Sequence, residues 1–272
     1  MTKWIQAATA AFQFLSRFPV KAELEFTPEL LKRSVKFYPL VGASIGLVVW
    51  LVGFGFSLIM PSLSAAVLTL ILWVWLTGGL HLDGLMDTAD ALLSYRSRDK
   101  MLEIMKDSRV GAMGVIACVL LLLMKVSLLD SIIEQKWGSG AFLLPMIWSR
   151  SFMGYAMNRW PMARQGEGLA GQFRNLGTKQ VLLSIGIAVF LSVLFIWIGI
   201  RLGFGSEKWS AEIAILCIMP VICLGVGTLF ASRMSARLGG LTGDTYGALN
   251  ELLEAVLLLF CVITMHIIQI YG

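Results

Sequence analysis

The stretch LSAAVLTLILWVWLTGGLHLDGLMDTAD, residues 63–90, joins two very different kinds of sequence. Residues 63–80 are apolar and uncharged, and such a segment is nearly long enough to cross a bilayer as a helix. Asp83, Asp87 and Asp90 follow at spacings of four and three residues, which places their carboxylates on one face of a helix. The stretch therefore predicts a membrane helix that leads directly into an acidic helix.

The acidic face indicates a metal site. Three like charges on one helix face repel each other, and a bound cation would offset that repulsion. Carboxylate oxygens are hard ligands, which favour Mg²⁺, Mn²⁺ or Ca²⁺ over softer metals. The alternative is a solvated acidic surface, but unpaired carboxylates are costly directly after an apolar segment. We expect Asp83, Asp87 and Asp90 to bind a divalent metal ion.

The whole composition is that of a membrane protein. Of the 272 residues, 57% are hydrophobic and 14% are charged, and the mean hydropathy is +0.79. A soluble domain cannot hide so much apolar surface in one core. We expect an all-α, polytopic integral membrane helical bundle in one domain, 1–272, with about seven transmembrane helices. The expected spans are 37–60, 63–80, 111–129, 140–157, 181–200, 211–231 and 248–270.

Positive charge predicts the orientation of these spans. Of the 22 Lys and Arg residues, 17 lie before the first expected span or after the second, fourth and sixth. The positive-inside rule then predicts a cytoplasmic N-terminus, cytoplasmic motif-bearing loops and an external C-terminus. Residues 1–36 form the expected cytoplasmic N-terminal segment, in which 4–18 resemble an interfacial helix. The segment lacks the apolar core and the cleavage site of a signal peptide.

The remaining composition adds no further partner class. The net charge of +5 needs no nucleic acid, because anionic lipids and an anionic substrate account for it. The four cysteines fall inside expected spans without a CxxC pair, which is typical of packing residues.

Other polar residues stand near the acidic helix or inside spans. Lys106, Asp107 and Arg109 either form a salt-bridged helix start, or Asp107 joins the acidic cluster while the two cations bind phosphate. The glycine-rich loop 159–179, which contains Arg164, suits a lid over an anionic ligand, although flexible basic loops are also common at membrane surfaces. Arg150 lies inside the fourth expected span and should face the interior of the bundle.

A second polar cluster begins the seventh expected span. Asp244 lies among glycines whose backbone can offer amide groups to phosphate, and its carboxylate can reach a metal. Asn250 and Glu254 share one helix face, and Glu251 or Glu254 is the expected partner of Arg150.

Three motifs together resemble the cobalamin synthase family, also called adenosylcobinamide-GDP ribazoletransferase or cobalamin 5′-phosphate synthase. They are GGLHLDGLMDTADAL at 78–92, KDSRVGAMGV at 106–115 and GGLTGDTYGALNELLE at 239–254. The resemblance covers essentially the whole chain. It implies a Mg²⁺-dependent membrane enzyme that joins adenosylcobinamide-GDP to α-ribazole or α-ribazole 5′-phosphate. A ribose hydroxyl attacks the phosphorus next to cobinamide, which gives adenosylcobalamin or its 5′-phosphate, and GMP leaves.

This reaction implies roles for the polar residues. Asp83, Asp87, Asp90 and Asp107 would bind the metal, with Asp83 and Asp107 as catalytic residues. His81 would orient a carboxylate or the hydroxyl, or else make a structural hydrogen bond. The expected substrate-binding residues are His81, Lys106, Arg109, Arg150, Arg164, Asp244, Thr245, Asn250 and Glu254. Membrane lipids are expected partners, while a homo-oligomer and the docking of other cobalamin-assembly enzymes are left open.

Two alternatives come from other classes of protein. A CDP-alcohol phosphotransferase also uses membrane aspartates and Mg²⁺, but here Asp83-Gly84 lacks the Ala-Arg that its motif requires. A cation-coupled transporter would place its carboxylates near the bilayer midplane and show related halves. Most acidic residues of this chain gather at one membrane face, and no internal repeat is visible.

Overall fold

The computed structural model describes residues 2–135, 138, 140–164, 169–202 and 209–271. Across these residues the chain is helical, and the one β-bridge is an isolated pair between Met162 and Leu241. The long helices are α3 (Tyr38–Ser57), α4 (Ser62–Thr77), α7 (Ala112–Glu134), α8 (Gly140–Arg159), α9 (Thr178–Leu202), α10 (Trp209–Leu238) and α11 (Gly243–Tyr271). The shorter ones are α1 (Lys3–Leu15), α2 (Pro28–Ser34), α5 (Leu80–Leu92) and α6 (Arg98–Ile104), with 3₁₀ turns η1 (Val35–Phe37) and η2 (Leu169–Phe173).

The predicted class, an all-α polytopic membrane protein, is confirmed. Among the described residues, five helical segments are long and apolar enough to cross a membrane, and a sixth is reached if α4 and α5 count as one bent span. All seven expected spans fall on helices, but the count of seven is not confirmed, because α4 has 16 residues and α8 is not among the five. Of the 20 residues of α8, 17 are buried. A helix so shielded from lipid does not need a fully apolar surface, which explains why α8 is less apolar than the five spans.

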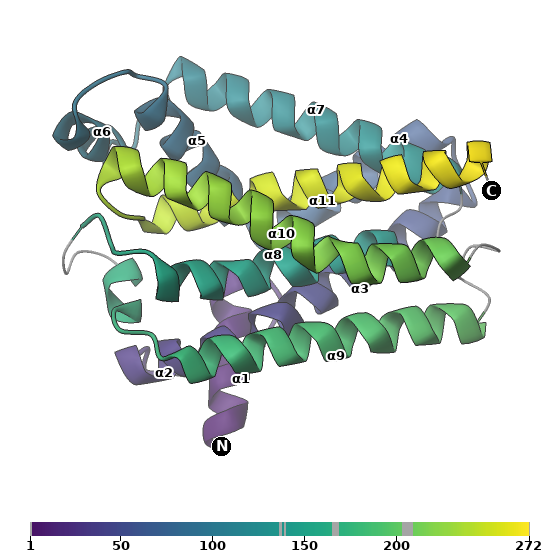
Figure 1. Ribbon diagram of the computed structural model, residues 1–272, viewed down its shortest axis with the longest axis horizontal. Helices are drawn as coiled ribbons and strands as arrows, with labels where there is room; N and C mark the ends of the chain where they lie inside the picture. The colour runs from purple at the N-terminus through teal and green to yellow at the C-terminus, as the bar shows by residue number, and fades with distance from the viewer. Residues whose placement is uncertain (1, 136–137, 139, 165–168, 203–208, 272) are drawn as a thin grey trace.

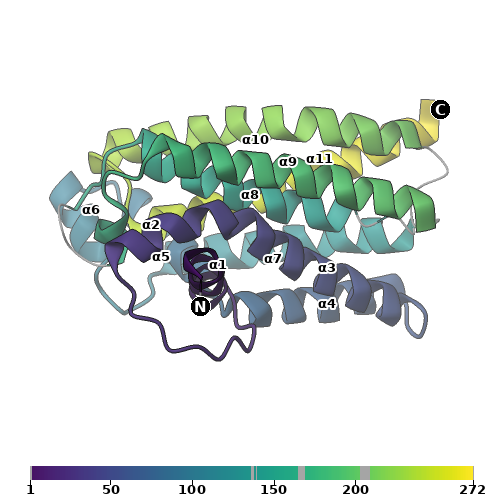
Figure 2. The same cartoon turned by 90° about the horizontal axis from the view of Figure 1, so that it is seen from below.

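The long helices run side by side, with α8 at the centre of the bundle (Figures 1 and 2). Helix α3 approaches α8 closely through Gly42 and Gly46. A methyl group on Gly46 would lie 2.9 Å from the Cα atom of Leu143, and one on Gly42 would overlap the backbone of Met146. Small residues thus allow backbone contact between the two helices, as in many membrane bundles.

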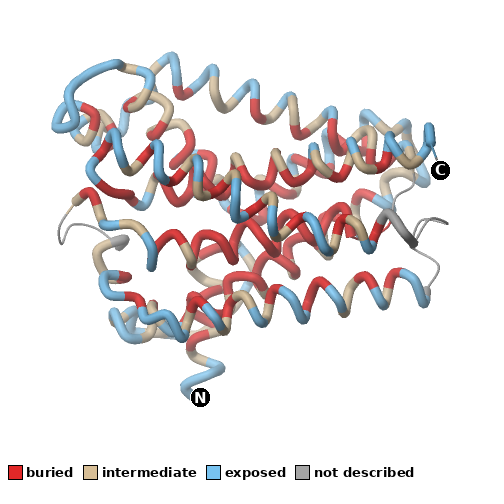
Figure 3. The backbone as a smooth tube through the Cα atoms, viewed as in Figure 1, coloured by how far each residue is buried: buried red, intermediate tan, exposed pale blue. Residues whose placement is uncertain are grey.

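The outer faces of the bundle are apolar. Large hydrophobic side chains such as Ile71 and Trp75 on α4, Leu120 on α7 and Phe190 on α9 are more than half exposed. Figure 3 shows exposed and buried positions alternating along the outer helices, whereas the central ones are mostly buried. Such a belt suits contact with lipid chains rather than with water.

A sharp corner separates α4 from α5. Gly78 and Gly79 adopt positive φ angles of 67° and 73°, a conformation that glycine reaches without strain, and the two helices meet at 89°. Helix α5 therefore lies outside the five spans. It shares one end of the bundle with α6, η2 and the α10–α11 turn, while the C-terminus lies at the other end (Figure 1). Helix α1 runs across the bundle axis (Figure 2).

Candidate functional site

The acidic helix α5 packs backbone to backbone on the start of α11. A methyl group on Gly84 would lie 2.6 Å from the carbonyl oxygen of Asp244, and one on Gly247 would lie 3.2 Å from the Cα atom of His81. These glycines let the helices approach closely, which brings the acidic face of α5 next to Asp244. Two motifs that lie about 160 residues apart in the chain thus form one site.

The turn before α11 is fixed against the segment that follows α8. Gly240 has a φ of 147°, and the backbone of Leu241 exchanges hydrogen bonds with Pro161 (2.8 Å) and Ala163 (2.9 Å). This pairing carries Arg164 to the site, where its Nη1 lies 3.9 Å from Oδ2 of Asp244. Arg164 also donates from Nη2 to the carbonyl oxygen of Leu102 (3.0 Å), so its guanidinium group is held in place.

The first turn of α11 is closed by a reciprocal cap. The Thr242 amide donates to Oγ1 of Thr245 (2.8 Å), and the Thr245 amide donates to Oγ1 of Thr242 (3.2 Å). Thr245 is fully buried by these contacts. Thr245 therefore stabilises the turn that carries Asp244. Its contact with substrate stays a prediction.

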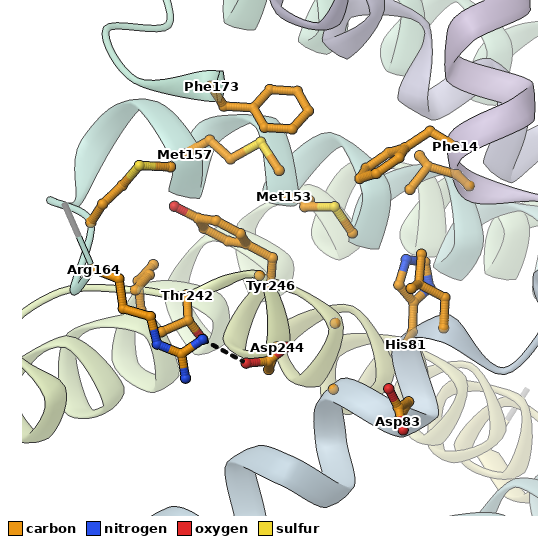
Figure 4. Close-up of a pocket in the computed structure, with 17 residues that line it drawn as sticks. Phe14, His81, Asp83, Met153, Met157, Arg164, Phe173, Thr242, Asp244 and Tyr246 are labelled. Atoms are coloured by element: carbon orange, nitrogen blue, oxygen red, sulfur yellow. Dashed lines mark hydrogen bonds and ion pairs between the residues drawn. The ribbon is translucent and has the colours of Figure 1, made fainter. Parts of the chain in front are cut away.

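A cavity of about 260 Å³ lies beside these residues, between α1, α5, α8, η2 and α11. Asp83, His81, Asp244 and Arg164 contribute polar side chains to its wall (Figure 4). The rest of the wall combines leucines, glycines and Thr242 with six aromatic residues and methionines, which are Phe14, Met153, Met157, Met162, Phe173 and Tyr246. A charged edge therefore borders an apolar interior.

The carboxylates at this edge influence one another. Partial burial is the main reason that the pKa of Asp87 is raised to about 6, and neighbouring negative charges add to the shift. The neighbours are Asp83, Asp244 and Asp90, in order of strength, and the charge of Arg164 acts in the opposite direction. Negative charge thus exceeds positive charge around Asp87.

Hard oxygen donors with an excess of negative charge have the chemistry that a divalent cation requires. Within the residues that the structure describes, no three His, Cys, Asp or Glu side chains are grouped closely enough to form a ready-made metal site. The donor set fits Mg²⁺, and its binding stays a prediction.

Asp90 makes contacts that the sequence did not reveal. Its Oδ2 accepts the backbone N–H of Gly111 (2.7 Å) and its Oδ1 accepts that of Gly114 (2.8 Å), so it caps the N-terminus of α7. A methyl group on either glycine would collide with this carboxylate. Gly111 and Gly114 of the second motif thus leave the space that the Asp90 carboxylate occupies. These hydrogen bonds do not test the predicted metal contact of Asp90.

Asp107 is paired locally rather than with the acidic face. Its carboxylate accepts hydrogen bonds from Arg109, with the shortest at 2.7 Å, and this pairing lowers the pKa of Asp107 to about 2. The Arg109 side chain is 88% exposed. Lys106 lines a small surface hollow together with Arg164. The structure therefore brings Lys106 near the site, while the metal and base roles of Asp107 and the phosphate role of Arg109 stay predictions.

An ionic network lies inside the bundle. Arg150 donates from Nη1 to Oε1 of Glu254 (2.6 Å), which confirms the expected pairing. Lys125 on α7, which the sequence analysis did not single out, bridges Glu251 (2.7 Å) and Glu254 (2.6 Å). All four side chains are at most 4% exposed. Arg150 and Glu254 are not among the residues that line the cavity, and their predicted contacts with substrate are untested.

Asn250 links this network to the cavity. Its Nδ2 lies 3.1 Å from Oε1 of Glu254 and 3.0 Å from Nδ1 of His81. Since His81 lines the cavity, it has both the structural hydrogen bond and the access to the site that the sequence analysis treated as alternatives.

The sequence analysis missed several residues of the site. Lys125 could have been noticed as a lysine inside an apolar span, which is rare without a function or a partner. Tyr246, Met153 and Met157 gave no such signal, because an apolar residue looks alike whether it lines a cavity or packs against a helix.

The chain is similar to known proteins over most of its length. Residues 7–262 match the model of the family described as cobalamin-5-phosphate synthase. The adenosylcobinamide-GDP ribazoletransferase of Brevibacillus brevis is 36% identical over 252 residues, which cover 93% of this chain and 96% of that protein. The enzymes of the same name from Pseudomonas fluorescens SBW25 and Desulforamulus reducens are 39% and 38% identical, over 91% and 90% of this chain and 96% and 91% of theirs. No solved structure matches significantly. These matches favour the transferase over the two alternative classes.

Proposed function

The chain belongs to the cobalamin-5-phosphate synthase family, and from this premise we propose that it is an adenosylcobinamide-GDP ribazoletransferase. The observation that carries the proposal is the meeting of Asp83 and Asp244 with Arg164 at the edge of one cavity. A ribose hydroxyl of α-ribazole, or of its 5′-phosphate, attacks the phosphorus next to cobinamide, and the bond to GMP breaks.

Each side chain at the edge has a place in this reaction. The guanidinium group of Arg164 offers donors that match phosphate oxygens, and Lys106 adds positive charge from the neighbouring hollow. Asp83 is exposed and borders the cavity, so it can accept the hydroxyl proton. Asp107 suits this task poorly, because its pairing with Arg109 makes it a weak base.

We propose that Mg²⁺ is the cofactor and that Asp83, Asp87 and Asp244 hold it. Asp90 borders the same cluster while it caps α7. A bound Mg²⁺ would neutralise charge on the diphosphate. Partial burial is the main cause of the raised pKa of Asp87, but part of the shift reflects negative charge that Arg164 alone does not balance, and that charge supports this assignment.

We also propose that the protein lies in the bacterial cytoplasmic membrane with its N-terminus and its motif-bearing loops in the cytoplasm. The support is the concentration of Lys and Arg in the N-terminal segment and in the loops after the second, fourth and sixth expected spans. The shared position of α5, α6 and the α10–α11 turn at one end of the bundle is consistent with this orientation (Figure 1).

The test is an assay of GMP release by the full chain in lipid nanodiscs, with adenosylcobinamide-GDP, either acceptor and Mg²⁺. Asp83→Asn should lower turnover by at least about 100-fold, as expected for loss of a base or of a metal ligand. Glu134→Gln is the control, because Glu134 is an exposed carboxylate at the C-terminal end of α7, and it should retain wild-type turnover. If the wild-type protein releases no GMP from these substrates, the proposed function is wrong.

A further inference from the structure

We propose that the cavity between α5, α8 and α11 is the binding site for the heteroaromatic base of the acceptor nucleoside, and that Tyr246 and His81 recognise this nucleoside by hydrogen bonds. We call the cavity the base pocket, defined by Phe14, Met153, Met157, Met162, Phe173 and Tyr246. The inference rests on the proposed function, since the acceptor there is a riboside of dimethylbenzimidazole.

The size of the base pocket selects a small ligand. Its volume of about 260 Å³ lies just below the range of roughly 300 to 1,000 Å³ that is usual for small-molecule pockets. A two-ring base fits such a space, whereas a corrin macrocycle does not. The corrinoid therefore has to approach from outside, on the side of Arg164 and the carboxylates.

The lining of the base pocket suits a flat, apolar ring system. Methionine sulfur atoms and aromatic faces make favourable contacts with aromatic rings, and three methionines and three aromatic residues define the pocket. Guanine, the other base in the reaction, carries several donors and acceptors along its edge. Most of these would be left without partners among methionine and phenylalanine side chains. Dimethylbenzimidazole has two methyl groups and a single free ring nitrogen, so it loses far less on burial.

The Tyr246 hydroxyl and Nε2 of His81 are buried polar atoms in the wall that are left for a ligand. Tyr246 is 2% exposed and His81 is 3% exposed, and both line the cavity. Neither the Tyr246 hydroxyl nor Nε2 of His81 has a hydrogen-bond partner within the part of the chain that the structure describes. Buried polar groups are nearly always hydrogen-bonded, so such atoms in a cavity wall indicate a ligand that supplies the partners. In Figure 4 the Tyr246 hydroxyl points toward the methionine side of the pocket, away from Asp83.

The buried network fixes which nitrogen of His81 carries the proton. Glu254, held by Arg150 and Lys125, accepts one hydrogen of the Asn250 amide group. The same amide nitrogen lies 3.0 Å from Nδ1 of His81, so Nδ1 must accept and Nε2 must carry the hydrogen. His81 therefore presents an N–H donor to the pocket.

These donors assign the two ends of the acceptor. The Tyr246 hydroxyl donates to the free ring nitrogen of the base, among the methionines. His81 Nε2–H donates to a ribose hydroxyl oxygen. Asp83, on the same helix, lies near this hydroxyl and can take the proton of the attacking hydroxyl.

The experiment compares two acceptors in the full chain in nanodiscs. One is α-ribazole, and the other is the riboside of 5,6-dimethylindole, in which a C–H group replaces the free ring nitrogen. The Kd of each is measured by calorimetry, and the KM of both substrates is measured by GMP release. We expect the wild-type protein to bind the indole riboside about tenfold more weakly than α-ribazole.

Tyr246→Phe should weaken α-ribazole binding by about tenfold and no longer distinguish the two acceptors, while the KM for adenosylcobinamide-GDP changes less than about twofold. Tyr38→Phe is the matched control, because Tyr38 is a fully buried tyrosine that does not line the base pocket. It should keep the wild-type preference.

Two results would overturn the inference. If Tyr246→Phe discriminates between the acceptors as strongly as the wild type does, Tyr246 does not contact the ring nitrogen. If the KM for adenosylcobinamide-GDP rises in place of the α-ribazole Kd, the pocket holds the other substrate. A wild-type protein that binds α-ribazole with the expected preference but releases no GMP would refute the proposed function and leave the base pocket standing.

Discussion

The backbone of Gly84 lies directly against the backbone of Asp244, so close that a methyl group on Gly84 would be 2.6 Å from the Asp244 carbonyl oxygen. This contact joins the two acidic motifs. Gly84→Ala should push α5 away from α11, separate Asp83 and Asp87 from Asp244, and lower GMP release by more than about tenfold. Gly186→Ala is the control, because nothing lies within 4 Å of the added methyl group there. Wild-type turnover in Gly84→Ala would contradict the proposed joint site.

Magnesium binding should depend on pH through Asp87. Its pKa is raised to about 6, so the carboxyl group holds its proton below that pH and cannot bind a cation well. Below pH 6 the affinity for Mg²⁺ should fall by up to about tenfold per pH unit, and above it the affinity should level off. Calorimetric titration of Mg²⁺ at several pH values measures this.

Asp87→Asn should bind Mg²⁺ more weakly and without this pH dependence, whereas Glu134→Gln should behave as the wild type does. An unchanged pH profile in Asp87→Asn would remove Asp87 from the metal site.

Asp90 should contribute to stability through α7. Asp90→Ala leaves the amides of Gly111 and Gly114 without their acceptor, which should lower the free energy of unfolding by about 1–2 kcal/mol. Thermal unfolding in detergent measures this loss. The Kd for Mg²⁺ should change less than about twofold, and a loss beyond tenfold would give Asp90 the ligand role that the sequence predicted.

The two glutamates of the buried ionic network should contribute unequally to the free energy of unfolding. Glu254→Gln removes the negative charge that pairs with both Arg150 and Lys125, and breaking a buried pair typically costs about 3–5 kcal/mol. Glu251→Gln should cost less, since the ion pair of Glu251 is with Lys125. Unfolding in detergent distinguishes the two variants, with Glu134→Gln at the exposed end of α7 as control. Equal losses for Glu251→Gln and Glu254→Gln would refute this ranking.

Local patterns in the sequence predicted much of this structure. Hydropathy placed every long helix, because each span must satisfy its own backbone in lipid. Helical spacing put Asp83, Asp87 and Asp90 on one face, and the cost of a buried charge predicted a partner for Arg150, which is Glu254. Each of these inferences needs only a short window or a single energetic rule.

The remainder depends on which helices meet. Lys125 and Glu251 are 126 positions apart, and no local pattern links them. Asp107 does not join the acidic face because its carboxylate pairs with Arg109, which is only two residues further along the chain. The base pocket is formed by five segments, so its existence could not be read from any one of them.

The order of the network's members along the chain has a consequence for how the protein is made. Lys125 and Arg150 precede Glu251 and Glu254, so a growing chain delivers two cations to the membrane before the carboxylates that neutralise them have been synthesised. Each unpaired cation at the centre of a spanning helix costs about 2.5–3.5 kcal/mol on insertion scales. Ribosomes stalled before residue 251 should therefore leave fragments that membrane proteases remove quickly, and only chains that have gained α11 should persist.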